Sequence, residues 1–424
     1  MEYSLKITKE ISTDVLVIGA GTAGVFAAIT AAREDVSVML VEKGSMCGGT
    51  ITSCGVDYPG IFHAWGKQII DGPCFEAVKR AEALGGAVIP EIVYKPDRHW
   101  KMQVRLNVFT YVHVLEEMLS ESGVNVLYHT LLADIKETEN GVQALLVTKE
   151  GCILVNAKAA IDASGDANAV SKAGFGVLKS ETLQPATLIN DISGYEFSEA
   201  LAPAVNEVFD KAMESGEISK RDLQGRKPMD ILREKRIHCH IHTSLPESSQ
   251  GKTKLEMEAR SCVFKVLSVF KRVKGLENIK VHSFFSECGV RESVRIDAHT
   301  NITSEDYVSG KVYEDAVCYA FYPIDLHTDH AIKQTFLEEG VVPTIPYSAL
   351  VPKGSKYILA CGRIIGSDTD ANSALRVQAP CMATGQVCGA AAAIMAKDSG
   401  DVHVDYGKLC ENLRKIGAIV PDNN

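Results

Sequence analysis

Residues 15–24 read Val15-Leu16-Val17-Ile18-Gly19-Ala20-Gly21-Thr22-Ala23-Gly24, and this stretch decides the fold. An apolar run enters the glycines, an alanine-rich segment leaves them, and a second apolar run, 36–41, ends at Glu42. In a strand–turn–helix unit these glycines permit a tight turn, a close approach to a pyrophosphate and close packing of the helix on the sheet. The helix N-terminus then faces the phosphate charge, and the acid can accept hydrogen bonds from ribose hydroxyls. The stretch predicts a dinucleotide-binding α/β fold, with an ordinary glycine turn as the alternative.

Length and composition narrow the class of protein. The chain has 424 residues, which favours two domains, and its formal net charge of -10 argues against a nucleic-acid partner. We expect no signal peptide and no membrane partner, and therefore a cytoplasmic protein. The twelve cysteines contain no CxxC pair, so we expect reduced core thiols and no metal site.

The pattern along the chain predicts one domain interrupted by another. Helical spacing is present at 74–85 and 108–122, and strand-like runs occur at 124–128, on both sides of 139–141, and at 157–162. We predict a Rossmann-like domain with a parallel sheet and flanking helices, formed by 1–175 and 341–424. The return segment supplies a strand at 357–363 and a final helix after Pro380. A mixed α+β substrate domain at 176–340 interrupts it.

Four pieces of the chain together resemble a known family. They are the glycine stretch with Glu42-Lys43 and Gly48-Gly49-Thr50, then Ile161-Asp162-Ala163-Ser164-Gly165-Asp166, then Gly289-Val290-Arg291-Glu292-Ser293-Val294-Arg295-Ile296, and finally Gly362-Arg363 through Leu375-Arg376-Val377 to Gly385-Gln386. The chain resembles the broad bacterial family of FAD-dependent oxidoreductases, within the glutathione-reductase-like flavoprotein superfamily. It departs from that pattern at Asn372-Ser373-Ala374, where relatives commonly carry histidine and serine.

The resemblance implies FAD as the cofactor and assigns its contacts. The glycine stretch would hold the pyrophosphate, Glu42 the adenosine ribose, the 48–50 loop the phosphate or ribityl side, 163–165 the adenosine half, and Gly362-Arg363 with the last helix the flavin. The implied cofactor residues are Gly19, Ala20, Gly21, Thr22, Ala23, Gly24, Glu42, Lys43, Gly48, Gly49, Thr50, Ala163, Ser164, Gly165, Asp166, Gly362, Arg363, Arg376 and Val377.

Candidate catalytic residues cluster in two short segments. Histidine suits proton transfer near neutral pH, and Asp325 lies on the same face as His327 if the segment is extended. His327 is therefore the candidate base, with a structural or cofactor-contacting histidine as the alternative. Arg291 and Arg295 can stabilise a reduced flavin or bind a substrate carboxylate, or they can form ion pairs with nearby glutamates.

The alternation His238-Cys239-His240-Ile241-His242 would set three imidazoles on one face of a strand. A shared metal is one interpretation of such a pattern. Because neither a carboxylate nor a cysteine pair completes the set, a polar strand face lining the substrate cavity is the favoured interpretation.

These observations predict an FAD-dependent dehydrogenase or oxidase that oxidises a small polar organic substrate by hydride transfer to flavin N5. The alternatives are a flavin-dependent reductase of an activated double bond and an electron-transfer flavoprotein subunit. The expected partners are a small-molecule substrate and an unidentified electron acceptor or donor. Association of the chain into a homo-oligomer is compatible with the sequence.

Overall fold

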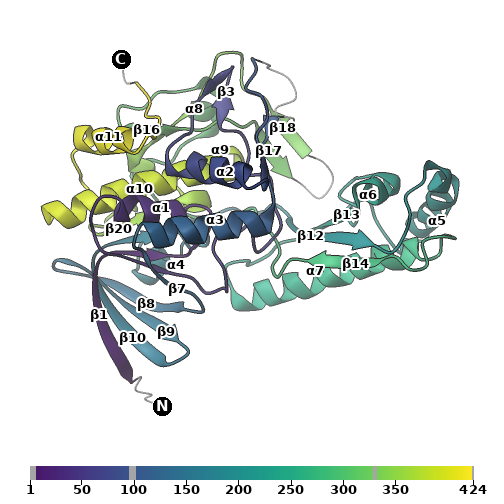
Figure 1. The fold of residues 1–424 in the computed structure, drawn as a ribbon, viewed down its shortest axis with the longest axis horizontal. Coiled ribbons are helices and arrows are strands. Elements are labelled where there is room, and N and C mark those ends of the chain that lie inside the picture. Colours follow the sequence, from purple (N-terminus) through teal and green to yellow (C-terminus); the bar gives the residue numbers. More distant parts are fainter. Residues whose placement is uncertain (1–5, 95–101, 328–331, 423–424) are drawn as a thin grey trace.

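The computed structural model describes residues 6–94, 102–327 and 332–422, and they form two lobes (Figure 1). The larger lobe is built on a seven-stranded sheet. Six strands follow the order β7-β2-β1-β10-β9-β8, and the seventh, β20, pairs with the end of β10. The strands are β1 (Ile7–Ile18), β2 (Val38–Val41), β7 (Asn125–Leu127), β8 (Leu131–Thr138), β9 (Gly141–Thr148), β10 (Gly151–Asp162) and β20 (Ile358–Ala360).

The centre of this sheet is parallel. β1 pairs in parallel with both β2 and β10, β2 with β7, and β10 with β20, whereas β8 and β9 form an antiparallel extension. Alternate residues of β1 enter different cores, with Val15 and Val17 in one and Leu16 and Ile18 in the other. Burial of both faces explains the uninterrupted apolar runs that marked these strands in the sequence. The α/β fold with a parallel sheet is confirmed.

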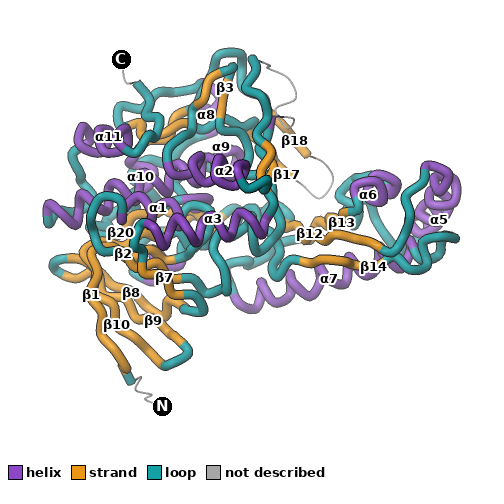
Figure 2. Tube along the Cα trace, viewed as in Figure 1, coloured by secondary structure: helices purple, strands orange, loops and turns teal. Residues whose placement is uncertain are grey.

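Helices cover the sheet, as Figures 1 and 2 show for α1, α3 and α10. Of the described residues, only α10 is long and apolar enough to cross a membrane, and its apolar window is completely buried within the protein. A Cβ on Gly385 of α10 would lie 2.2 Å from the carbonyl oxygen of Ala23, so the close approach of α10 to the start of α1 requires glycine. The helices of this lobe are α1 (Gly24–Ala32), α2 (Pro73–Ala83), α3 (Val108–Glu121), α4 (Asn168–Lys172), α8 (Ser304–Ser309), α9 (Thr369–Leu375), α10 (Gln378–Asp398) and α11 (Tyr406–Lys415).

The second lobe extends to one side of the first (Figure 1). It contains a three-stranded sheet in the order β13-β12-β14 and its own hydrophobic core, drawn from residues between Ala186 and Val290. Its elements are β12 (Ala186–Ser193), β13 (Arg236–Ile241), β14 (Lys280–Phe284), α5 (Ala202–Glu214), α6 (Pro228–Glu234) and α7 (Ser249–Phe270).

Five short strand pairs complete the set of described strands, and one of them, β17 with β18, contributes residues to the cavity described below. Residues after 290 add side chains to the cores of the larger lobe, among them Ile296 and Ile302, whereas the predicted substrate domain runs on to 340. The exact domain boundaries stay a prediction. The pairs are β3 (His63–Ala64) with β4 (Lys67–Gln68), β5 (Ala87–Val88) with β6 (Arg105–Leu106), β11 (Val177–Lys179) with β15 (Val294–Ile296), β16 (Ala316–Tyr319) with β19 (Thr344–Pro346), and β17 (Ile324–His327) with β18 (Ile332–Thr335).

Candidate functional site

A cavity of about 390 Å³ opens at the carboxyl ends of the parallel strands and continues to the second lobe. Ligands of open α/β sheets bind at this edge because the strand ends and the helix N-termini meet there. One end of the cavity is lined by the glycine stretch after β1, and the other by side chains from β12, β13 and β17. The cavity therefore joins a nucleotide end to a polar end.

The nucleotide end of the cavity is formed by glycines, whose lack of a side chain permits close packing and leaves space for a ligand. A Cβ on Gly24 would lie 1.9 Å from the carbonyl oxygen of Gly19, so α1 can pack against the end of β1 only with glycine there. A Cβ on Gly21 would meet only the carbonyl oxygen of Ala163, at 3.8 Å, so the backbone at Gly21 borders open space. The N–H groups of Val25 and Ala27 donate to the carbonyl oxygens of Gly21 and Ala23, and the helix dipole gives this end of α1 a partial positive charge. This end is a cradle suited to an anionic pyrophosphate.

Glu42 braces the cradle from the end of β2. Its two carboxylate oxygens accept hydrogen bonds from the N–H groups of Ala20 and Gly44, each at 2.8 Å. Glu42 also lines the cavity, and each oxygen keeps a lone pair for a ribose hydroxyl. The geometry is compatible with the predicted ribose contact and adds a bracing role that the sequence did not indicate.

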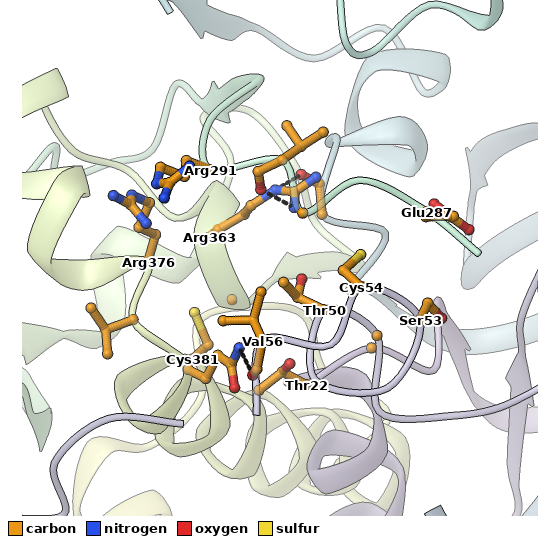
Figure 3. A pocket seen from close by; sticks show the side chains of 18 of the residues that line it. Thr22, Thr50, Ser53, Cys54, Val56, Glu287, Arg291, Arg363, Arg376 and Cys381 are labelled. Carbon is orange, nitrogen blue, oxygen red and sulfur yellow. Dashed lines mark hydrogen bonds between the residues drawn. The ribbon is translucent and has the colours of Figure 1, made fainter. Parts of the chain in front are cut away.

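Arg363 joins the nucleotide end to the rest of the cavity. Its guanidinium donates hydrogen bonds to the Gly165 carbonyl at 2.6 Å, the Val290 carbonyl at 2.8 Å and Asp166 at 2.7 Å. The Asp166 carboxyl is buried, which opposes ionisation, but the Arg363 charge holds the pKa of that carboxyl below its usual value. Arg363 therefore ties the segment after β10 to the segment before β15 (Figure 3).

At the polar end, β17 presents Asp325 and His327 on the same face. Nε2 of His327 lies 2.9 Å from Oδ2 of Asp325, and the other carboxylate oxygen accepts a hydrogen bond from Gln334 at 2.9 Å. Nδ1 of His327 is buried and has no hydrogen-bond partner among the described residues. A neutral imidazole that donates from Nε2 to the carboxylate leaves Nδ1 as a free acceptor. The pair has the arrangement that the alternation in the sequence predicted.

The ionisation of this pair follows from its burial. Burial lowers the pKa of His327 to about 4, although the hydrogen bond to Asp325 acts in the opposite direction. Burial raises the pKa of Asp325, but the hydrogen bond and charge of His327, with the Arg376 charge, lower it to about 2. At neutral pH the pair is therefore a carboxylate and a neutral imidazole.

Two arginines lie side by side beyond this pair, Arg291 and Arg376 (Figure 3). Arg291 donates hydrogen bonds to the Pro185 carbonyl and the Thr187 hydroxyl, both at 2.6 Å. Arg376 donates to the Gln184 side chain at 3.1 Å. Burial, and then the charge of Arg376, lowers the pKa of Arg291 to about 9, and burial lowers the pKa of Arg376. Both guanidinium groups remain charged at neutral pH.

Two histidines of the alternation, His238 and His240, lie on β13, whereas His242 follows the end of that strand, so the expected face of three imidazoles is not formed. His238 lines the cavity, while His240 lies between Nη2 of Arg291, at 3.2 Å, and the Gln224 amide, at 2.7 Å. Burial, with nearby arginine charges, lowers the pKa of His238 to about 3 and of His240 to about 2. The described residues contain no group of three or more metal-ligating side chains.

Arg295 lies apart from the other candidate catalytic residues. It is buried, pairs with Glu292 at 2.8 Å and donates to the Ser367 carbonyl at 2.9 Å, and it is not among the residues lining the cavity. This is the ion pair that was the structural alternative in the sequence. The structure therefore brings Arg291, Asp325 and His327 together and places Arg295 in the packing between β15 and the loop before α9.

Most of the predicted cofactor residues also line the cavity. Gly24, Ala20 and Gly48 do not, although each belongs to the same turns. The predicted residues that do line it are Gly19, Gly21, Thr22, Ala23, Glu42, Lys43, Gly49, Thr50, Ala163, Ser164, Gly165, Asp166, Gly362, Arg363, Arg376 and Val377.

The sequence analysis did not identify several polar residues at the polar end of the cavity. Gln184 accepts hydrogen bonds from Arg376 and from the His327 backbone, and Thr187 and Tyr322 line the cavity. Gln184 and Thr187 come from the stretch just before and within β12, which carries no recognisable motif. The one signal in this stretch is Pro185, which predicts a break in regular secondary structure and no functional site.

The comparison with protein families gives one broad match. A family model described as FAD dependent oxidoreductase matches residues 14–413. Digeranylgeranylglycerophospholipid reductase 1 of Methanosphaera stadtmanae is 29% identical over 178 residues, covering 38% of this chain and 40% of that protein. Dihydrolipoyl dehydrogenase 3 of Haloarcula marismortui is 34% identical over 119 residues, covering 28% of this chain and 23% of that protein. These matches span less than half the length of either curated relative.

Solved structures with a similar arrangement have low sequence identity. A geranylgeranyl bacteriochlorophyll reductase-like protein from Thermoplasma acidophilum has a TM-score of 0.44 and 12% identity, covering 96% of this chain and 83% of that one. The p-nitrophenol 4-monooxygenase PnpA from Pseudomonas putida DLL-E4 has a TM-score of 0.42 and 13% identity, covering 96% of this chain and 84% of that one.

Proposed function

The chain belongs to the family of FAD dependent oxidoreductases, and from this premise we propose that it oxidises a small polar organic substrate at the Asp325–His327 end of its cavity. FAD is the cofactor. When bound, FAD supplies the two-electron acceptor that no amino-acid side chain provides.

The nucleotide end of the cavity fits this cofactor. The space beside Gly21 that a Cβ would enter, the N-terminus of α1 and the carboxylate of Glu42 suit a pyrophosphate joined to a ribose. We assign the flavin half to the part of the cavity bordered by Gly362 and Val377, between the cradle and the arginines.

His327 has the protonation state that proton removal needs. Oxidation of an alcohol or amine takes a proton from oxygen or nitrogen in addition to the hydrogen on carbon. We assign the proton to Nδ1 of His327, the buried acceptor without a partner among the described residues. The role of Asp325 is to hold the proton on Nε2 and to stabilise the imidazolium once it has formed.

The observation that carries this proposal is the orphaned Nδ1 of a neutral, carboxylate-oriented histidine in the wall of the cavity. The test is anaerobic mixing of the FAD-loaded protein with polyols, hydroxy acids and amino acids, while the visible flavin bands are followed. A substrate should bleach the bands in the wild type. His327→Gln should keep the oxidised flavin spectrum and bleach about 10²–10⁴-fold more slowly, the usual contribution of a positioned general base.

A matched control is His403→Gln, which changes a histidine in the connection between α10 and α11, outside the residues that line the cavity. It should bleach at the wild-type rate. Equal rates for His327→Gln and the wild type would overturn the role of His327. Oxidation of pre-reduced protein by enoates, without bleaching by any donor, would instead favour a reductase of activated double bonds.

We also propose a cytoplasmic location. All twelve cysteines are free and buried. Reduced thiols in this number are typical of a reducing compartment.

A further inference from the structure

The paired arginines at the polar end indicate the chemical class of the substrate. Resting on the proposed function, we infer that the substrate is a small carboxylic acid whose carboxylate binds between Arg291 and Arg376. It is a hydroxy or amino acid in which the oxidised carbon is close to the carboxylate.

The charges at this end of the cavity favour an anionic ligand. Within the described chain, neither Arg291 nor Arg376 has a carboxylate within salt-bridge distance, although both are partly buried in the cavity wall. The carboxylate of Asp325 is already engaged by His327 and Gln334. Two arginines therefore face one carboxylate, that of Asp325, so this end of the cavity carries one positive charge that no carboxylate neutralises.

Other arginines that are partly or fully buried make the contrast clear. Arg295 pairs with Glu292 at 2.8 Å, Arg363 pairs with Asp166 at 2.7 Å, and Arg236 is held by two aspartates, at 2.8 and 2.9 Å. A buried charge is costly unless it is paired. The two arginines that face the cavity depart from this pattern, and an anionic ligand is the group that would complete it.

The two guanidinium groups also have hydrogen-bond donors that the protein does not use. Nε of Arg376 is buried without a hydrogen-bond partner, and only its Nη2 donates to protein acceptors. Nη1 of Arg291 uses both protons on Pro185 and Thr187, while Nη2 uses one on His240. Each guanidinium carries five N–H donors, so two remain on Arg291 and three on Arg376 for a ligand. Carboxylates accept such paired donors in a bidentate geometry.

The guanidinium groups are held in place before a ligand binds. Three hydrogen bonds hold Arg291, and two hold Arg376, to Gln184 and to the Asp325 carbonyl. The Nε2 atom of Gln184 is a further buried donor that lacks a partner among the described residues. A preformed donor set loses little conformational entropy on binding.

The position of the arginines restricts the rest of the substrate. His240 contacts Arg291 at 3.2 Å, and its ring centroid lies 5.3 Å from that of His327. Arg376 contacts the backbone of Asp325, at 3.4 Å. The carboxylate and the proton acceptor are thus separated by about one side chain, which requires the reacting carbon to be near the carboxylate.

The test measures binding without turnover. FAD-loaded protein is titrated with propionate, with oxalate and with the neutral propionamide, and the shift of the flavin visible spectrum gives each Kd. In the wild type we expect propionate to bind at least about 10-fold more tightly than propionamide, because only the acid can form charge-assisted bonds.

Arg291→Gln and Arg376→Gln should each weaken propionate binding about 10–100-fold and leave propionamide nearly unchanged. Lys252→Gln is the matched control, because it removes a positive charge from the same cavity wall, but one already paired with Glu287 at 3.2 Å. It should change the propionate Kd by less than about threefold. Arg376→Lys keeps the charge without the fork and should fall between the wild type and the glutamine variant.

Equal affinity of the wild type for acid and amide would overturn the inference, and this comparison needs no variant to fold. Propionate affinity unchanged in both glutamine variants, with only the flavin reduction potential altered, would assign the arginines to the flavin instead. The proposed function can fail separately from this inference. If propionate binds but no hydroxy or amino acid bleaches the flavin, the oxidation is contradicted and the carboxylate site is not. If neutral polyols bleach the flavin and propionate does not bind, the carboxylate site is contradicted and the oxidation is not.

Discussion

Replacement of Asp325 by asparagine should turn the histidine of the candidate site into the wrong tautomer. In the wild type, Oδ1 accepts a hydrogen bond from the Gln334 amide at 2.9 Å, and Oδ2 faces Nε2 of His327 at 2.9 Å. An asparagine has one acceptor oxygen and one NH₂ group. If its oxygen stays on Gln334, its NH₂ faces Nε2, which must then accept. The imidazole proton moves to Nδ1, the atom that we expect to receive the substrate proton.

The magnitude follows from what is lost at this pair. The carboxylate side chain is 12% exposed and the imidazole 11%, so water replaces little of the interaction. Loss of the correct tautomer together with the charged partner of the imidazolium should slow substrate oxidation about 10³-fold, or about 4 kcal/mol of transition-state stabilisation. Binding of carboxylates should change much less, because the donors for the carboxylate are the arginines.

The assay is the anaerobic rate of flavin bleaching in single-turnover mixing, with the hydroxy or amino acid that reduces the wild type. Gln334→Ala removes the second partner without changing the carboxylate and should stay within about threefold of the wild type. Asp325→Asn combined with Gln334→Glu gives the asparagine NH₂ a carboxylate to face, turns its oxygen toward His327 and should recover about 10-fold over the single variant. A single Asp325→Asn variant with the wild-type rate would refute the reasoning.

Three further outcomes follow from the same structure. Protonated His327 cannot accept a proton, so kcat/KM in pH-jump measurements should be constant from about pH 8 to 5 and should fall only near the lowered pKa of about 4. A fall of kcat/KM that begins near pH 6.5 would instead mean that burial does not lower the pKa of His327. Gly24→Ala would place a Cβ 1.9 Å from the Gly19 carbonyl oxygen, so it should cost about 1–3 kcal/mol of stability and lower the flavin-to-protein absorbance ratio, whereas Gly400→Ala, with no atom within 4 Å, should change neither. Glu292→Gln leaves a buried arginine without its carboxylate and should lower the urea free energy of unfolding by about 3–5 kcal/mol; a loss below about 1 kcal/mol would contradict the pairing.

The nucleotide end was predictable because its determinants are local. The glycines, the two buried strands and Glu42 lie within about one strand–helix–strand unit, where spacing alone sets which backbone atoms meet. The Asp325–His327 pair was predictable for a similar reason, since residues two apart share a face of a strand. The bracing of Ala20 and Gly44 by Glu42 was not predicted, because it depends on the final angle between β2 and the glycine turn.

The polar end was not predictable as a whole, since its side chains come from segments that are far apart in the sequence. Gln184 lies just before β12, Arg291 lies in the segment before β15, and Arg376 directly follows α9. Any one of them has ordinary structural interpretations. Only the tertiary arrangement turns an arginine, an amide and a histidine into one donor set.

Arg291 and Arg295 show where sequence reasoning stops. They are four residues apart, they belong to one motif, and the same ion pairs were open to both. Glu292 satisfies Arg295, which enters the packing beside β15, while Arg291 precedes that strand and turns toward the cavity without a carboxylate. The difference is decided by which of the two a glutamate can reach, and not by residue type. For this reason the unneutralised charge, and not the presence of arginine, is the feature that indicates an anionic substrate.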